Sequence, residues 1–351
     1  MNAHLQAVRR LALAAGIVGA LSFTAQTISA QAPATPSVTV SGVGYTQYAY
    51  QLKDTANHVN NFSVQRAYVN VLGKFAGGIT TRVTMDVTPA AAGNQFIRLK
   101  YAYFAYTPDA SALTFKLGMI QTPWIDWEEA LWDYRMQGTV ALDRNGYLTS
   151  SDAGVGVDGK WNNDAVNAQV DIVNGEGYSG GIGDQRKDIQ GRVSVRVMNT
   201  DDASRVGGLR LSGYFGIGRT TTGGIRDRYV GMASYRSTQF TLAGEYAATR
   251  DAAGNGNLIS VFGVYHFTGS KAAAIARLDI VKPNRAALST APGYTNTRLI
   301  VGPSYQLSPN VRLLADLDLL SFKNESSLTP AQQLVLDATR QTALFQAQFT
   351  F

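Results

Sequence analysis

The feature of this sequence that most restricts its fold is an alternation of apolar and polar residues that recurs along nearly the whole chain. In the stretch GITTRVTMDV, Ile79, Val83 and Val87 share one face of an extended strand, while Arg82 and Asp86 share the other. Segments of about ten residues repeat this pattern and are separated by Gly, Asn, Asp, Pro and Ser. The alternation predicts an all-β protein, in which residues 330–339 are the one stretch expected to form a short loop helix.

The number and spacing of the alternating segments favour a membrane barrel. We count 16 between residues 37 and 351, and most reach about ten residues, enough to cross a bilayer. Short connections, such as 74–76 and 162–164, alternate with long ones, such as 120–149 and 323–341. An even strand number with short turns at one rim and long loops at the other is typical of a transmembrane antiparallel β-barrel of the bacterial outer membrane. A soluble sandwich is the alternative, but its strands average about five or six residues.

The N-terminus carries the pattern of a secretory signal peptide. Arg9 and Arg10 precede an apolar run over residues 11–23, and small residues follow up to Ala32. We predict cleavage after Ala32, with cleavage after Ala30 as the alternative. Residues 1–32 are then the signal peptide, and residues 33–351 form a single barrel domain. An uncleaved anchor is the other interpretation, but a spanning helix needs about 20 residues.

Composition excludes several classes of function. The net charge of +6 falls to +4 once Arg9 and Arg10 leave with the signal peptide, which is too mild to indicate nucleic-acid binding. The sequence has no cysteine, so disulfides and thiol chemistry are not available. His58 and His266 lack metal-ligand spacing. We therefore expect no metal and no cofactor.

The stretch GMIQTPWIDWEEALWDYR, residues 118–135, begins the third and longest loop. Tryptophans are unfavourable in water, so we expect them to pack against the inner wall of the barrel. The four acids would then face water in the pore. This predicts an inward-folded constriction loop with eight candidate residues: Trp124, Asp126, Trp127, Glu128, Glu129, Trp132, Asp133 and Arg135.

Basic residues recur on the polar faces of the predicted strands. We expect seven of them to line the pore: Arg66, Arg82, Arg98, Lys100, Lys116, Arg192 and Arg196. The first five lie on consecutive strands and are opposed there only by Asp86. In IRLKYAYF, Tyr101 and Tyr103 are expected to face outward with Ile97 and Leu99. A basic wall opposite an acidic loop predicts a mild preference for anions.

The order of four motifs resembles a known family. RAYVNVLGKF, the TPW loop, SSDAGVGVDGKW and NGEGYS followed by DQRKDIQGRVSVRV look like the phosphate-selective O and P porins and related bacterial porins with a TPW loop. The resemblance implies a 16-stranded barrel, usually trimeric, with the third loop in the lumen. It also implies that outer-membrane assembly machinery reads the terminal Phe351. Phosphate-selective members carry lysines and arginines on the constriction loop, whereas this loop is acidic.

We therefore predict an outer-membrane porin for passive diffusion of small hydrophilic solutes and ions, with no catalytic residues. The expected partners are the lipid bilayer, the solutes or anions themselves and the assembly machinery. One alternative is a barrel enzyme, either lipase-like with His266 as base or a glycosidase using Glu128 and Glu129. Adjacent carboxylates point apart, however, and a single histidine is a weak signal. The other alternative is a structural or adhesive barrel. The GVGVDG stretch matches a dinucleotide-binding pattern by its letters, but no helix follows it.

Overall fold

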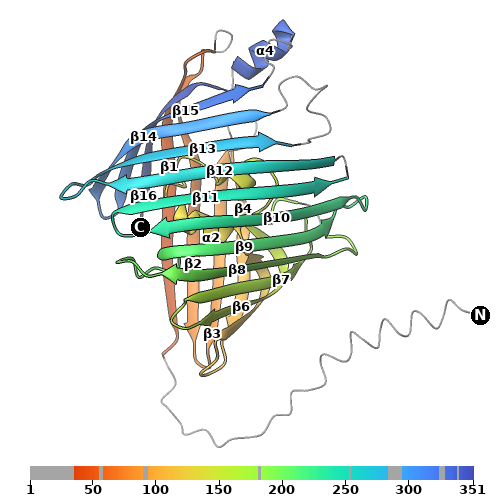
Figure 1. Ribbon diagram of the computed structural model, residues 1–351. Coiled ribbons are helices and arrows are strands. Elements are labelled where there is room, and N and C mark those ends of the chain that lie inside the picture. The colour runs from red at the N-terminus through yellow and green to blue at the C-terminus, as the bar shows by residue number, and fades with distance from the viewer. Residues whose placement is uncertain are drawn as a thin grey trace, which may run out of the picture. The chain divides into compact units, whose positions relative to one another are not determined.

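The computed structural model describes residues 35–54, 58–89, 94–180, 183–252, 254–283, 295–323, 329–337 and 340–351. The predicted signal peptide, residues 1–32, lies outside the described residues. Within them, 16 antiparallel strands form a closed barrel in which each strand pairs with its neighbours in the chain and β1 pairs with β16 (Figure 1). The predicted fold class, an all-β barrel of 16 strands, is confirmed.

The strands follow one another around the barrel without crossovers. Their bounds are β1 Ser37–Gln51, β2 Asn60–Phe75, β3 Ile79–Pro89, β4 Gln95–Tyr106, β5 Leu113–Gln121, β6 Ser151–Trp161, β7 Val166–Val173, β8 Asp188–Met198, β9 Gly208–Arg219, β10 Ile225–Arg236, β11 Phe240–Asp251, β12 Gly254–His266, β13 Ala272–Lys282, β14 Asn296–Ser308, β15 Val311–Phe322 and β16 Thr342–Thr350.

Pairing between the first strand, β1, and the last, β16, closes the sheet into a barrel. Register between β1 and β16 runs from Val43 opposite Thr350 to Gln51 opposite Thr342. Beyond it, the Gly42 N–H donates to the Phe351 carbonyl over 2.9 Å, and the Phe351 N–H donates back over 3.1 Å. Closure leaves no unpaired strand edge, and a barrel in lipid requires this because lipid offers no hydrogen bonds.

The strands bury their polar face and expose their apolar face. On β8, Ile189 and Val193 are exposed on the outside, while Gln190 and Arg192 are buried on the inside. Leu211 on the neighbouring β9 also points outward. A soluble β-protein has its apolar face inside and its polar face outside. An apolar outer face and a polar inner face are typical of membrane barrels with a polar interior.

Three short helices lie in the connections. The helix α4, Pro330–Asp337, confirms the helix expected at residues 330–339. Two others, α2 Ile125–Leu131 and α3 Ala141–Arg144, lie between β5 and β6. The sequence did not indicate these two helices, because helices of 7 and 4 residues are too short to build a clear helical period. No helix of the described residues has the length and apolar character needed to cross a membrane.

A β-bulge in β4 reverses the expected faces of two tyrosines. Met85 of β3 pairs with Leu99 of β4. The residue before Met85, Thr84, pairs with Tyr101, so Lys100 is an extra residue in β4. Lys100 and Tyr101 are consequently both buried on the inside, at 5% and 4% exposure. The prediction that Tyr101 and Tyr103 face outward is therefore wrong. After the bulge, Phe104 takes the outward position.

Candidate functional site

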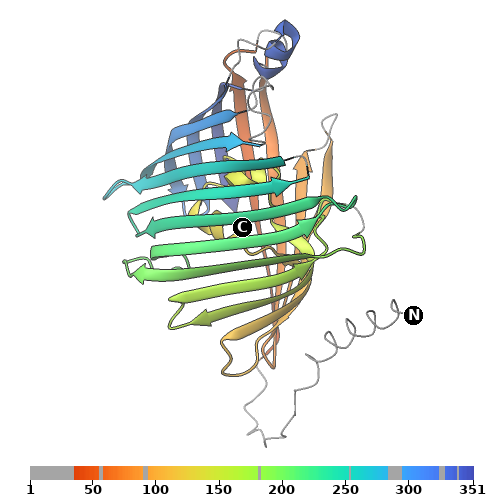
Figure 2. The ribbon, with the colours of Figure 1, turned by 45° about the vertical axis from the view of Figure 1, so that its right-hand side comes forward.

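The connection between β5 and β6, residues 122–150, is here called the β5–β6 segment. Both views draw its α2 in yellow between the green strands of the near wall and the orange strands of the far wall (Figures 1 and 2). The side chains of Trp124, Trp127 and Trp132 are at most 1% exposed. A segment that buries three indoles completely must be packed on all sides of them.

Side chains from strands β8 to β16 donate hydrogen bonds to backbone carbonyls of this segment. The pairs are Arg192 Nε to Pro123 (2.9 Å), Arg236 Nη1 to Ala130 (2.6 Å), Arg312 Nη1 to Asp133 (2.6 Å), Gln346 Nε2 to Met136 (2.9 Å), Arg277 Nη1 to Thr139 (2.9 Å) and Arg228 Nε to Tyr147 (3.2 Å). These carbonyls have no strand partner, so the strand side chains satisfy them. The contacts fix the segment against five strands, which are β8, β10, β13, β15 and β16.

The tryptophans make the apolar part of the same attachment. The Trp124 indole N–H donates to Glu245 Oε2 of β11 over 3.2 Å. The Trp132 ring centroid lies 5.3 Å from that of Phe262 on β12. The guanidinium of Arg192 lies 4.0 Å from the centre of the Trp127 ring, a favourable cation–π distance. Arg192 was expected to line the pore, but it is buried under the indole and holds the segment instead.

Glu128 departs from the sequence prediction. It was expected to face water, yet it is fully buried, because residues 125, 127, 128 and 131 form the buried face of α2. Its carboxyl lies among Glu245, Arg277 and Asp279 of the wall. Burial, reinforced by Glu245, raises the pKa of Glu128 well above its ordinary value. The buried position where α2 meets the wall therefore favours the protonated form of Glu128.

Three other acids of the segment, Asp126, Glu129 and Asp133, line a cavity of about 350 Å³. Each already has a basic partner: Asp126 pairs with Arg205 over 2.7 Å, Glu129 with Arg135 over 2.8 Å, and Asp133 with Arg312 over 3.1 Å. The pairing with Arg205 lowers the pKa of Asp126 although burial opposes it. The basic partners offset much of the negative charge of these three acids.

The facing wall of this cavity comes from β1 to β4 and β16 and contains Arg82 and Lys100. The guanidinium of Arg82 lies 4.4 Å from the centre of the Tyr101 ring, and the Lys100 ammonium lies 4.8 Å from that of Tyr68. Within the described residues, no carboxylate lies within ion-pair distance of either cation. The cavity therefore has acids and bases on opposite sides, with an excess of uncompensated positive charge.

The remaining predicted basic residues pair with acids of the wall or lie elsewhere. Arg66 and Arg98 both pair with Asp86, over 3.4 and 2.9 Å. Lys116 pairs over 2.5 Å with Asp158, which lies on the next strand, β6. Arg196 donates to the Asn163 carbonyl, next to a short turn and away from the cavity. The structure thus brings Arg82 and Lys100 together with the segment acids and separates Arg196 from them.

Sequence reasoning missed several residues of this site. Arg205 and Arg312 pair with segment acids, and Glu245 receives the Trp124 N–H. Glu245 lies on the polar face of its strand, which gave a signal for a lumen position but none for its partner. Arg205 lies in a connection without a periodic pattern, so no sequence signal marked it.

The residues that would support an enzyme do not assemble into a catalytic group. The side chain of His266 is exposed at the end of β12, and Glu128 points away from Glu129, which lines the cavity. In the part of the chain that the structure describes, no group of three His, Cys, Asp or Glu residues could hold a metal ion.

Comparison with known proteins gives the fold. No protein-family model and no curated protein matches this chain. The solved structure of Salmonella typhi OmpF in complex with daunomycin is similar, with a TM-score of 0.65, 14% identity, and coverage of 90% of this chain and 97% of that chain. The anion-selective porin from Comamonas acidovorans is also similar, with a TM-score of 0.62, 15% identity, and coverage of 90% and 100%. The chain has a porin fold. A third similar structure, the trimer form of the Vibrio cholerae outer-membrane protein OmpT, has a TM-score of 0.59, 11% identity, and coverage of 90% and 99%. These identities are low, so the likeness to the porins concerns the fold alone.

Proposed function

We propose that this chain is a porin of the bacterial outer membrane, exported by a cleaved signal peptide at residues 1–32. It would let small hydrophilic solutes and ions diffuse passively through a water-filled barrel, without catalysis or a cofactor. The observation that carries the proposal is the cavity of about 350 Å³ lined on one side by Asp126, Glu129 and Asp133 and on the other by Arg82 and Lys100.

We infer that the β5–β6 segment is the constriction of this channel. A barrel of 16 strands is wide enough to leave an aqueous lumen. The segment accepts hydrogen bonds from strands between β8 and β16, and it lines a cavity with β1 to β4. Contacts with opposite parts of the wall support a segment that crosses the lumen and narrows it.

We propose a mild preference for anions. The acids at the cavity are paired, while Arg82 and Lys100 have no carboxylate partner, so the local potential is positive. The three acids of the segment that line this cavity, Asp126, Glu129 and Asp133, argue against a filter dedicated to phosphate. The relation to the phosphate-selective porins would then concern the barrel and not the solute.

We propose that the barrel assembles as a homotrimer in the lipid bilayer and that the assembly machinery reads Phe351. The trimer form recorded for the similar Vibrio cholerae protein supports this arrangement. The side chain of Phe351 is exposed beyond the last pair of β16 and is therefore accessible to a partner.

Planar-bilayer recording tests the channel proposal. Folded protein without residues 1–32 should insert in steps with three conductance sublevels in KCl. Changing Arg82 and Lys100 together to Gln should shift the reversal potential towards cations at low salt. The shift should shrink when the ionic strength rises, because the screening length falls to about 8 Å at 0.15 M.

The matched control removes two charges elsewhere. Arg250→Gln with Lys323→Gln takes the same charge from two exposed residues at the long-loop rim. This pair should move the reversal potential much less than the Arg82 and Lys100 pair. Folded barrels that insert but pass no ions would contradict the channel proposal.

A further inference from the structure

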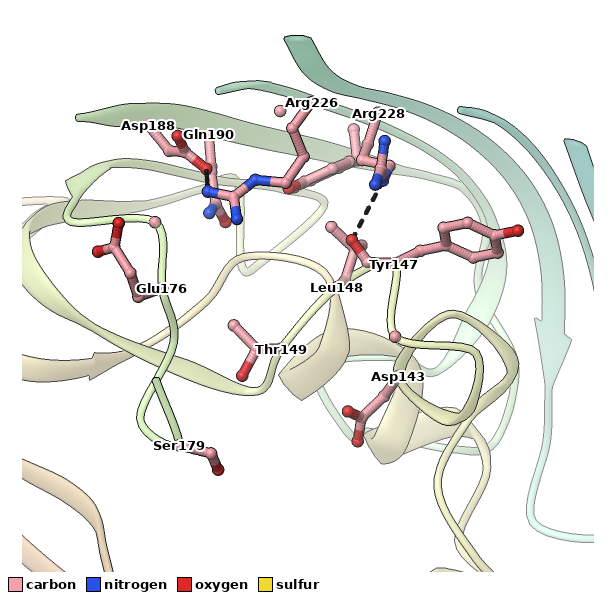
Figure 3. A pocket seen from close by; sticks show the side chains of 14 residues that line it. Asp143, Tyr147, Leu148, Thr149, Glu176, Ser179, Asp188, Gln190, Arg226 and Arg228 are labelled. Atoms are coloured by element: carbon pink, nitrogen blue, oxygen red, sulfur yellow. Dashed lines mark hydrogen bonds and ion pairs between the residues drawn. The ribbon is translucent and has the colours of Figure 1, made fainter. Parts of the chain in front are cut away.

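A second cavity, of about 300 Å³, lies apart from the constriction cavity (Figure 3). Its walls are the inner face of β8 to β10, residues 146–149 of the β5–β6 segment, and part of the connection between β7 and β8. Asp188 opens β8 and Arg226 lies at the start of β10, so the cavity is at the long-loop end of the barrel. A solute entering from that end would meet this cavity before the constriction.

The two arginines that line this cavity are already neutralised. Arg226 Nη2 pairs with Asp188 Oδ2 over 2.9 Å. Arg228 Nη2 pairs with Asp251 Oδ1 over 2.8 Å, and its Nε donates to the Tyr147 carbonyl. Both charges are thus compensated within the wall, and they give the cavity no net attraction for anions.

Two carboxylates of the cavity are not neutralised. Within the described residues no cation lies within ion-pair distance of Asp143 in α3 or of Glu176. One carboxylate oxygen of Glu176 is buried and accepts no hydrogen bond from the described residues. Burial raises the pKa of Asp143, and Arg135 is the strongest opposing influence. In Figure 3 the two carboxylates lie on either side of Thr149.

Two neutral polar side chains also reach the cavity and are more than nine-tenths buried. Gln190 is 6% exposed, and its Oε1 has no hydrogen-bond partner among the described residues. Its direct neighbour across the β8–β9 pair is Gly216. Tyr214 is 5% exposed, and its hydroxyl lies close to Gly216. A Cβ added to Gly216 would lie 2.6 Å from the hydroxyl oxygen of Tyr214. A buried amide without a partner is costly unless a ligand or water satisfies it.

We propose that this cavity binds a small polyhydroxylated organic cation of amino-sugar size. The ammonium group would pair with the Glu176 carboxylate, and the hydroxyl groups would hydrogen-bond to Asp143, Gln190 and Tyr214. This inference rests on the proposed channel, because it adds a solute subsite ahead of the constriction. A cavity of about 300 Å³ is at the lower end of the range for small-molecule sites, which suits one sugar ring and excludes longer chains.

Saturation-transfer NMR on folded barrels in detergent tests the binding, with glucosamine as the probe and glucose as its uncharged counterpart. Glucosamine should bind at least about tenfold more tightly than glucose, because a charge-assisted hydrogen bond to a partly desolvated carboxylate is stronger than a neutral one. Glu176→Gln should weaken glucosamine binding by about tenfold and change glucose binding little. Asp109→Asn, at an exposed short turn, should not weaken glucosamine binding.

The outcomes separate this inference from the channel proposal. Equal binding of glucosamine and glucose, or unchanged glucosamine binding in Glu176→Gln, would overturn the cation site. Potassium chloride conductance of the same preparation reports on the channel independently. Normal conductance without selective glucosamine binding contradicts only the subsite, whereas selective binding without conductance contradicts only the channel.

Discussion

At the scale of single residues, the buried carboxyl of Glu128 gives the interface between α2 and the wall a dependence on pH. Its neighbours are Glu245, Arg277 and Asp279 of the wall and the Trp124 indole, which is bonded to Glu245. The pKa of Glu128 is raised in the docked state, so that state binds a proton more tightly than the exposed side chain does. Docking is therefore most stable below the ordinary pKa of a glutamate. It weakens by about 1.4 kcal/mol per pH unit as pH rises towards the raised pKa.

Replacing Glu128 by Gln should remove this dependence, because the amide is neutral at every pH and keeps the shape of the side chain. We expect Glu128→Gln to raise the free energy of unfolding relative to the parent more at pH 9 than at pH 5. Urea unfolding at the two pH values measures this difference. Glu129→Gln, which loses an ion pair with Arg135 at the cavity, is the control and should not be stabilising at pH 9. The same effect of Glu128→Gln at both pH values would argue that Glu128 is ionised in the docked state.

At the scale of elements, the sequence predicted the strands well and the segment between β5 and β6 only in part. Each strand repeats a two-residue period over many residues, so the periodicity is clear even without its neighbours. The α2 helix has only 7 residues, and its apolar face is visible only once the helix is known. For this reason the sequence led to the prediction that Glu128 faces water. The bulge at Lys100 was also not predictable, because one inserted residue changes the face but not the alternation on either side.

The tryptophans allow a matched test of how α2 is held. Trp127 is buried beneath Arg192, whereas Trp161 is an exposed residue at the end of β6. Changing Trp127 to Ala should cost about 3–5 kcal/mol of stability, since it leaves a cavity and removes the cation–π contact. Changing Trp161 to Ala should cost much less. Urea unfolding midpoints give both values, and current noise should rise only in the Trp127 variant. Equal costs would show that Trp127 does not anchor the segment.

At the scale of the whole molecule, the strand count, the closed barrel and the polar inner face followed from the sequence because lipid and water impose one repeated pattern on every strand. Pairings between loop and wall did not follow, since Asp126 with Arg205 and Asp133 with Arg312 depend on distances across the barrel. Arg82 and Lys100 were predicted as inward bases, but their lack of carboxylate partners could be recognised only in three dimensions.

Two variants at the seam between β1 and β16 distinguish a structural role of Phe351 from its recognition by assembly machinery. Deleting Phe351 removes two backbone hydrogen bonds with Gly42, whereas Phe351→Ala keeps them and removes only the ring. If the ring is the assembly signal, both variants should assemble poorly in cells and fold normally in detergent. Gel mobility before and after boiling measures the folded fraction. Normal assembly of Phe351→Ala would rule out a signal that depends on the ring.

Cysteine labelling during current recording tests most directly whether the β5–β6 segment narrows the ion path. The native chain has no cysteine, so one introduced thiol is the only target. Asp133→Cys places it at the constriction cavity, where the Asp133 side chain is 55% exposed, and Leu211→Cys places it on the apolar outer face. A cationic thiol reagent added to open channels should lower the current stepwise in Asp133→Cys, with one step for each protomer, and leave Leu211→Cys unaffected. Unchanged current in fully labelled Asp133→Cys channels would contradict a constriction formed by this segment.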